Sequence, residues 1–90
     1  MTSSTPDIRM YTSDACPYCV RAKRLLTSKG VSFEEIHIGL RDMDARRRLA
    51  ELTGRYTVPQ ILVDERALGG YDDIKALDDA GRLDSLLGVS

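Results

Sequence analysis

The clearest regularity along the chain is a helical repeat of apolar residues between Pro17 and Lys29. Residues three, four or seven positions apart share one face of a helix. The apolar face consists of Cys19, Ala22, Leu25 and Leu26. The opposite, polar face carries Arg21, Arg24 and Ser28. Since Gly30 suits a helix end, the pattern predicts an amphipathic helix over residues 17–29.

The stretches on either side of this helix have the two-residue alternation of strands. Ile8 and Met10 predict a strand over residues 8–12. A second strand is predicted over residues 33–38, where Ile36 and Ile38 lie on one side and Glu35 and His37 on the other. The order strand, helix, strand favours a parallel pair joined by a right-handed crossover.

The second half of the chain predicts another helix and then a hairpin. The helix covers residues 42–52 and is expected to bury Met43, Leu49 and either Ala50 or Leu52. It ends at Thr53-Gly54. Strands over residues 60–63 and 66–68 flank an Asp64-Glu65 turn and form the hairpin.

A last helix is predicted to begin at Tyr71 or Asp72. Its apolar residues are Ile74 and Leu77 and, in a final turn, Leu83, Leu86 and Leu87. The complete order, β-α-β-α-β-β-α, predicts an α/β fold in which helices cover a mixed sheet.

Length and composition indicate one globular domain. The 90 residues are 42% hydrophobic and 30% charged, with a formal net charge of −1. This balance predicts neither a nucleic-acid partner nor a membrane partner. Residues 1–6 are polar and read as a flexible tail ahead of a single domain over residues 7–90. Because the tail lacks an apolar secretory segment, we expect a cytoplasmic protein.

The candidate chemistry lies where the first strand meets the first helix, at Cys16-Pro17-Tyr18-Cys19. Amides at a helix start lack partners and favour negative charge, so a thiolate at Cys16 would be stabilised there. We expect its pKa to fall below the ordinary value of about 8.5. Cys19 lies on the apolar helix face and is expected to be the inner cysteine of the pair.

Two other interpretations of the cysteines are inert burial and zinc binding. Zinc sites usually have four ligands, and this pair supplies two. His37 is the only histidine and no third cysteine exists, so an intrachain site would need carboxylates. We interpret His37 as a polar strand residue and predict no metal site.

With the cysteine motif, two further segments make the chain resemble the glutaredoxin family. They are Thr57-Val58-Pro59-Gln60 and Gly69-Gly70-Tyr71-Asp72-Asp73. The likeness covers residues 8–87 and is closest to small bacterial dithiol members. It implies a thioredoxin-like fold with a four-stranded mixed sheet. It also implies an enzyme that reduces protein disulfides and glutathione mixed disulfides, with Cys16 as nucleophile and Cys19 as resolving thiol.

The same resemblance implies a glutathione site, with glutathione as co-substrate and no bound cofactor. Pro59 matches the family's cis-proline, next to which Val58 pairs its backbone with the cysteine of glutathione. Tyr18 is expected to flank the tripeptide, and Arg46 to lie near its glycine carboxylate. The remaining expected contacts are Thr57, Gly70, Tyr71, Asp72 and Asp73, of which the last four surround the γ-glutamyl end.

Two positions depart from the family's pattern. Many members carry lysine three residues before the first cysteine, where this chain has Ser13 followed by Asp14. Loss of that cation and the nearby acid both disfavour a thiolate at Cys16. Tyr71 replaces the third cysteine of some bacterial members.

Three alternative functions remain at this point. The first is a redoxin that thioredoxin reductase reduces and that supplies electrons to ribonucleotide reductase. The second is a carrier of a glutathione-ligated [2Fe–2S] cluster, and the third is a binding module without catalysis. For the leading interpretation we expect a monomer whose partners are glutathione and disulfide-containing or glutathionylated proteins.

Overall fold

The computed structural model describes residues 6–89. Its elements follow in the order β1 (Ile8–Ser13), α1 (Pro17–Ser28), β2 (Glu34–Ile38), α2 (Met43–Thr53), β3 (Gln60–Val63), β4 (Arg66–Gly69), α3 (Tyr71–Asp79) and α4 (Leu83–Leu87). The predicted order of strands and helices is therefore confirmed up to residue 79. Of the expected tail over residues 1–6, residues 1–5 lie outside the described part of the chain.

The C-terminal segment differs from the prediction, since it forms two helices instead of one. The chain turns at Gly81, which has a φ of +72°. Glycine adopts this conformation readily because it has no Cβ. The turn is closed by a hydrogen bond from the amide of Arg82 to the carbonyl of Leu77.

The four strands form one mixed sheet in the order β2-β1-β3-β4. β1 runs parallel to β2 and antiparallel to β3, and β3 runs antiparallel to β4. The parallel pair ends with Ser13 opposite Ile38. This arrangement confirms the predicted α/β fold with a four-stranded mixed sheet.

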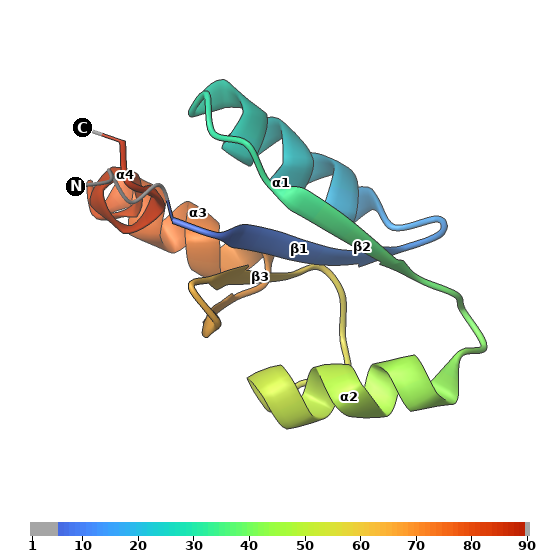
Figure 1. Ribbon diagram of the computed structural model, residues 1–90. Coiled ribbons are helices and arrows are strands. Elements are labelled where there is room, and N and C mark those ends of the chain that lie inside the picture. Colours follow the sequence, from blue (N-terminus) through green and yellow to red (C-terminus); the bar gives the residue numbers. More distant parts are fainter. Residues whose placement is uncertain (1–5, 90) are drawn as a thin grey trace.

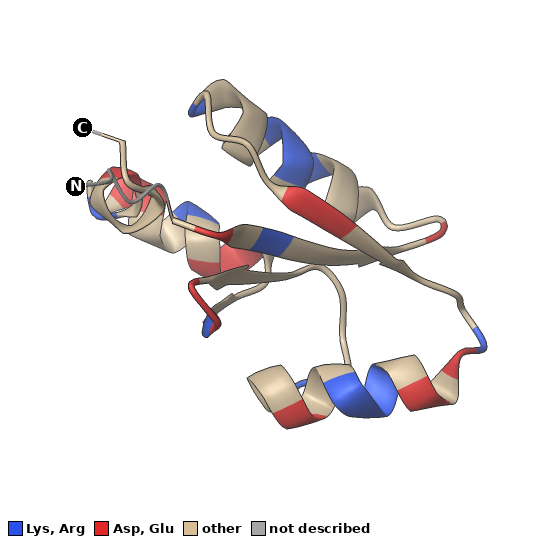
Figure 2. Ribbon diagram, viewed as in Figure 1, with Lys and Arg blue, Asp and Glu red and all other residues tan. Residues whose placement is uncertain are grey.

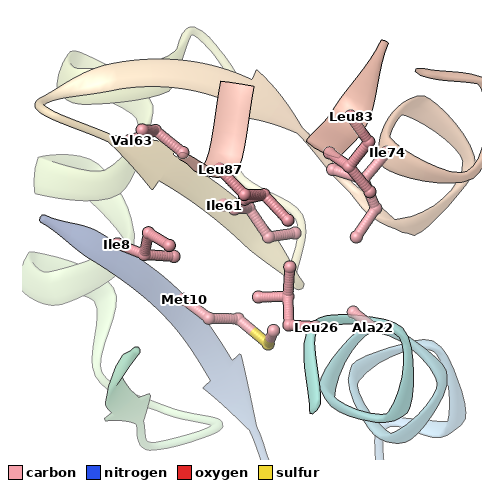
Figure 3. Packing of buried hydrophobic residues seen from close by; sticks show 9 residues of the cluster. All are labelled: Ile8, Met10, Ala22, Leu26, Ile61, Val63, Ile74, Leu83 and Leu87. Carbon is pink, nitrogen blue, oxygen red and sulfur yellow. The ribbon is translucent and has the colours of Figure 1, made fainter. Parts of the chain in front are cut away.

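Helices cover both faces of the sheet (Figure 1), and the main core lies on the face covered by α1, α3 and α4. Figure 3 shows side chains from β1 and β3 packing against Ala22 and Leu26 of α1, Ile74 of α3, and Leu83 and Leu87 of α4. The apolar face predicted for the first helix is confirmed, because Cys19, Ala22 and Leu26 are all buried. This packing fixes the start of α1 against the end of β1.

α2 covers the other face with a narrow apolar stripe, and the prediction that Met43 is buried is wrong. Leu49 is fully buried, whereas Met43 and Leu52 are 61% and 51% exposed. An α-helix turns by about 100° per residue, which places Met43 about 120° and Leu52 about 60° from Leu49, on opposite sides of it. The small side chain of Ala50 fills part of the stripe and is half-buried, as one of the two predicted alternatives.

Candidate active site

The cysteine pair lies at the start of α1, with Cys16 as the residue that caps the helix. Its Sγ accepts a hydrogen bond from the amide of Cys19 at 3.2 Å. Its carbonyl accepts from the amides of Cys19 and Val20. Pro17 occupies the first helical position, where a missing N–H leaves no helical bond unmade. The helix start therefore directs an amide at the sulfur of Cys16.

The two cysteines form a disulfide, with their Cα atoms 5.2 Å apart. They differ in burial, because Cys19 is 2% exposed and Cys16 is partly exposed. The expectation that Cys19 is the inner cysteine is confirmed. An incoming sulfur reaches Cys16 before it reaches Cys19.

The loop before β3 lies beside Cys16. The Val58–Pro59 peptide bond is cis, as the resemblance implied. The carbonyl oxygen of Val58 lies 3.8 Å from the Sγ of Cys16. Behind it, the side-chain amide of buried Gln60 donates to the hydroxyl of Thr57 at 3.3 Å. The loop thus holds extended backbone next to the exposed sulfur.

The start of α3 forms the next part of the site. A carboxylate oxygen of Asp73 accepts a hydrogen bond from the amide of Gly70 at 2.9 Å. That amide bond and then the guanidinium of Arg55 hold the pKa of Asp73 below its ordinary value. Gly69 has a φ of +112°, and a Cβ there would lie 2.6 Å from the Cγ of Asp73. The carboxylate therefore occupies space that only glycine leaves open.

A groove of about 170 Å³ joins the proline loop to α3. It contains all of the predicted glutathione-binding residues except Arg46, together with Arg55 and Gln60. One wall is aromatic, with the rings of Tyr18 and Tyr71 6.3 Å apart. The Oε1 atom of Gln60 is buried without a hydrogen-bond partner among residues 6–89. The groove is thus lined by polar groups and two tyrosines within reach of the Cys16 loop.

Arg46 lies outside this groove. Its Nη1 donates to the carbonyl of Tyr56 at 3.1 Å, so it supports the loop that leads to the groove. Figure 2 shows that the basic run on α2 is flanked by acidic residues of the same helical segment. Arg55 is the cation in the groove, and our sequence analysis missed it. Arg55 lies two residues before Thr57, and this nearness to a predicted site segment could have identified it as a candidate.

A second concavity of about 590 Å³ borders the cysteines on the side of β2. In it, Nε2 of His37 lies 2.8 Å from Oδ1 of Asp14. Glu35 pairs with Lys23 and accepts from the hydroxyl of Thr12, and these two bonds hold the pKa of Glu35 below its ordinary value. The charged groups of this concavity are therefore largely paired with one another.

Comparison with known proteins identifies the family. A family model described as Glutaredoxin matches residues 8–68. The chain belongs to the glutaredoxin family. This glutaredoxin is 51% identical over 83 residues to glutaredoxin 3 of Escherichia coli K12, a match covering 90% of this chain and 96% of that protein. A glutaredoxin of Pseudomonas aeruginosa is 49% identical over 82 residues, covering 91% and 96%.

Solved structures of glutaredoxins have the same thioredoxin-like fold. The solution structure of a Brucella melitensis glutaredoxin has a TM-score of 0.82 at 46% identity, covering 94% of this chain and 91% of that chain. The crystal structure of a buckwheat glutaredoxin–glutathione complex has a TM-score of 0.79 at 28% identity, covering 92% and 77%. With its Cys16–Cys19 pair, this glutaredoxin is a thiol–disulfide oxidoreductase.

Across residues 6–89, no three His, Cys, Asp or Glu side chains converge closely enough to hold a metal ion. None of the helices in the same range has the length and apolarity that crossing a membrane requires.

Proposed function

We propose that this glutaredoxin uses glutathione to reduce protein disulfides and glutathione mixed disulfides. The observation that carries the proposal is the groove that starts beside Cys16 and ends at the N-terminus of α3. A short peptide with a reactive sulfur at one point and charged groups at its end would match this shape. The buckwheat glutaredoxin of similar structure was solved as a complex with glutathione.

In the proposed reaction, the Cys16 thiolate attacks the glutathione sulfur of a mixed disulfide. A bond forms between Cys16 and that sulfur, the original S–S bond breaks, and the target protein leaves as a thiolate that takes up a proton. A second glutathione, as thiolate, then attacks the bound glutathione. This step releases oxidised glutathione and restores the Cys16 thiolate.

For a protein disulfide, the first attack leaves Cys16 joined to the target. Cys19 then attacks Cys16, which releases the reduced target and forms the internal disulfide. Two glutathione molecules reduce that disulfide again. Because Cys19 is buried and adjacent to Cys16, it is suited to this second, internal attack.

The groove residues would hold glutathione in the following way. Its cysteine pairs with the backbone of Val58 next to Pro59, and Tyr18 flanks it. The γ-glutamyl end meets Gly70 and Tyr71, with Asp72 and Asp73 facing the ammonium group. Glutathione serves as co-substrate and no cofactor is bound. We propose the cytoplasm as the compartment, since thiols are kept reduced there.

Two single-cysteine variants test the proposal. With a glutathionylated peptide, glutathione and glutathione reductase, we expect Cys16→Ser to abolish turnover and Cys19→Ser to retain it. With a protein disulfide that needs the internal attack, both variants should lose activity. Equal loss of both variants on the glutathionylated peptide would refute the assigned roles. Turnover supported by thioredoxin reductase but not by glutathione would refute the glutathione dependence.

A further inference from the structure

We propose that Arg55 binds the α-carboxylate of the γ-glutamyl residue and so selects glutathione over thiols that lack it. This inference rests on the proposed use of glutathione and adds a specificity-determining residue to it. Arg55 lines the groove at the end formed by α3, where it forms an ion pair with Asp73.

The backbone around Arg55 is anchored on both sides. α2 ends at Thr53, and Gly54, whose φ is +80°, caps its C-terminus. The hydroxyl of Thr53 donates to the carbonyl of Leu49 at 2.8 Å, and the amide of Arg55 donates to that hydroxyl at 3.1 Å. On the other side, Arg46 holds the carbonyl of Tyr56. The end of α2 thereby directs the Arg55 side chain toward α3.

The guanidinium of Arg55 has donors to spare. Its Nη1 donates to Oδ2 of Asp73 at 2.7 Å. A guanidinium carries five N–H groups in a planar fork, and this is its one hydrogen bond among residues 6–89. The side chain is 52% exposed, so the other donors are accessible. The planar guanidinium can donate two parallel hydrogen bonds to a carboxylate, which the ammonium group of a lysine cannot do.

The neighbouring charges explain why a zwitterion, and not a simple anion, would bind. Amides at the start of α3 and the guanidinium of Arg55 favour a carboxylate. Asp72 and Asp73 provide negative charge for an ammonium a short distance away. The α-amino and α-carboxylate groups of a γ-glutamyl residue present both charges on one carbon. Asp73 also orients Arg55, since its carboxylate fixes Nη1.

The alternative is that Arg55 only stabilises the start of α3 through Asp73. A substrate analogue separates the two roles. In 4-aminobutanoyl-cysteinylglycine, the α-carboxylate of glutathione is absent, the amine remains at the end of the chain, and the rest of the tripeptide is unchanged. Mixed disulfides of one peptide with glutathione and with this analogue give two substrates that differ in a single carboxylate.

The experiment measures kcat/KM for these two substrates with wild type and Arg55→Gln. The mixed disulfide of the same peptide with cysteinylglycine, which lacks the whole γ-glutamyl residue, is a third substrate. We expect Arg55→Gln to lower kcat/KM for the glutathione substrate by about tenfold or more, as loss of a charge-assisted hydrogen bond does. With the analogue, the variant should lie within about twofold of wild type. With the glutathione substrate, the kcat/KM of Arg55→Lys should lie between those of wild type and Arg55→Gln, because lysine keeps the positive charge but lacks the planar guanidinium. Arg47→Gln, a matched change at an arginine that pairs with Asp44 on α2, should leave both substrates unaffected.

An equal loss on both substrates would overturn the inference, since it would assign Arg55 a structural role. The inference would also be overturned if the wild type had a higher kcat/KM with the glutathione substrate than with the cysteinylglycine substrate, but equal values with glutathione and the analogue. If the wild type does not distinguish glutathione from cysteinylglycine, the proposed function itself fails. The three substrates therefore separate failure of this inference from failure of the proposed function.

Discussion

Replacement of Gly69 by alanine tests whether the start of α3 depends on the space beside that residue. Gly69 has a φ of +112°, a conformation that side chains disfavour. An added Cβ would also lie 2.6 Å from the Cγ of Asp73, where carbon atoms in contact normally stay about 3.5–4.0 Å apart. The Asp73 carboxylate would have to move, and its bonds to Gly70 and Arg55 would be lost.

The expected cost combines two terms. Holding alanine in a sparsely populated backbone region costs about 1–3 kcal/mol. Losing a side-chain hydrogen bond at a helix start costs about 1 kcal/mol. We therefore expect Gly69→Ala to lower the free energy of unfolding by about 2–4 kcal/mol, out of the roughly 5–15 kcal/mol of a small domain.

Urea denaturation provides the assay, and Gly30→Ala provides the matched control. Gly30 has a φ of +74° and open space around its Cβ position, so its substitution should cost only about 1–2 kcal/mol of backbone strain. In an Asp73→Ala background, Gly69→Ala should cost about 1 kcal/mol less than in wild type. The carboxylate and its bonds to Gly70 and Arg55 are then already absent, and only the close contact with the Cβ of residue 73, at 2.8 Å, remains. A cost of Gly69→Ala equal to that of Gly30→Ala, or unchanged by Asp73→Ala, would refute the steric argument.

Three further predictions concern stability and titration. Leu49→Ala should lower the free energy of unfolding by about 2–5 kcal/mol in urea denaturation, because Leu49 is the buried anchor of α2. The lowered pKa of Asp73 means that its charge stabilises the fold above the unfolded value near 3.8 and stops doing so as pH falls through the lower folded value. The stability difference between wild type and Asp73→Asn should therefore be constant near neutral pH and shrink below about pH 4. Lys23→Met should raise the pKa of Glu35 toward its ordinary value in a carboxyl NMR titration, and an unchanged pKa would contradict the assigned cause.

Local patterns were sufficient for the parts of the fold where one side of an element is buried. The spacing of Cys19, Ala22 and Leu26 located the buried face of α1, and with it the inner cysteine. The same reasoning failed for Met43 of α2, which is apolar but exposed, and it left open the choice between Ala50 and the exposed Leu52. Periodicity identifies which face of a helix is buried, but it does not show how many residues around that face the sheet covers.

The site depends on contacts between distant residues, which spacing does not encode. Arg55 and Asp73 are 18 positions apart, and their ion pair forms only once α2 and α3 are placed beside the proline loop. Arg46 was a reasonable candidate from its charge and its distance from Thr57. In the structure its guanidinium binds the carbonyl of Tyr56. Which arginine enters the groove is therefore a property of the assembled fold.

The surroundings of Ser13, Asp14 and the start of α1 bear on the thiolate that we propose at Cys16. Ser13 is buried and its hydroxyl donates to the carbonyl of Ile38 at 2.7 Å. Oδ1 of Asp14 lies 2.8 Å from Nε2 of His37. The amide of Cys19 already points at the sulfur of Cys16 in the disulfide form. On reduction the same amide meets a full negative charge, and a hydrogen bond to a charged acceptor is stronger than one to a neutral acceptor. We therefore expect the backbone at the start of α1, which no side-chain substitution removes, to be the principal support for a thiolate at Cys16.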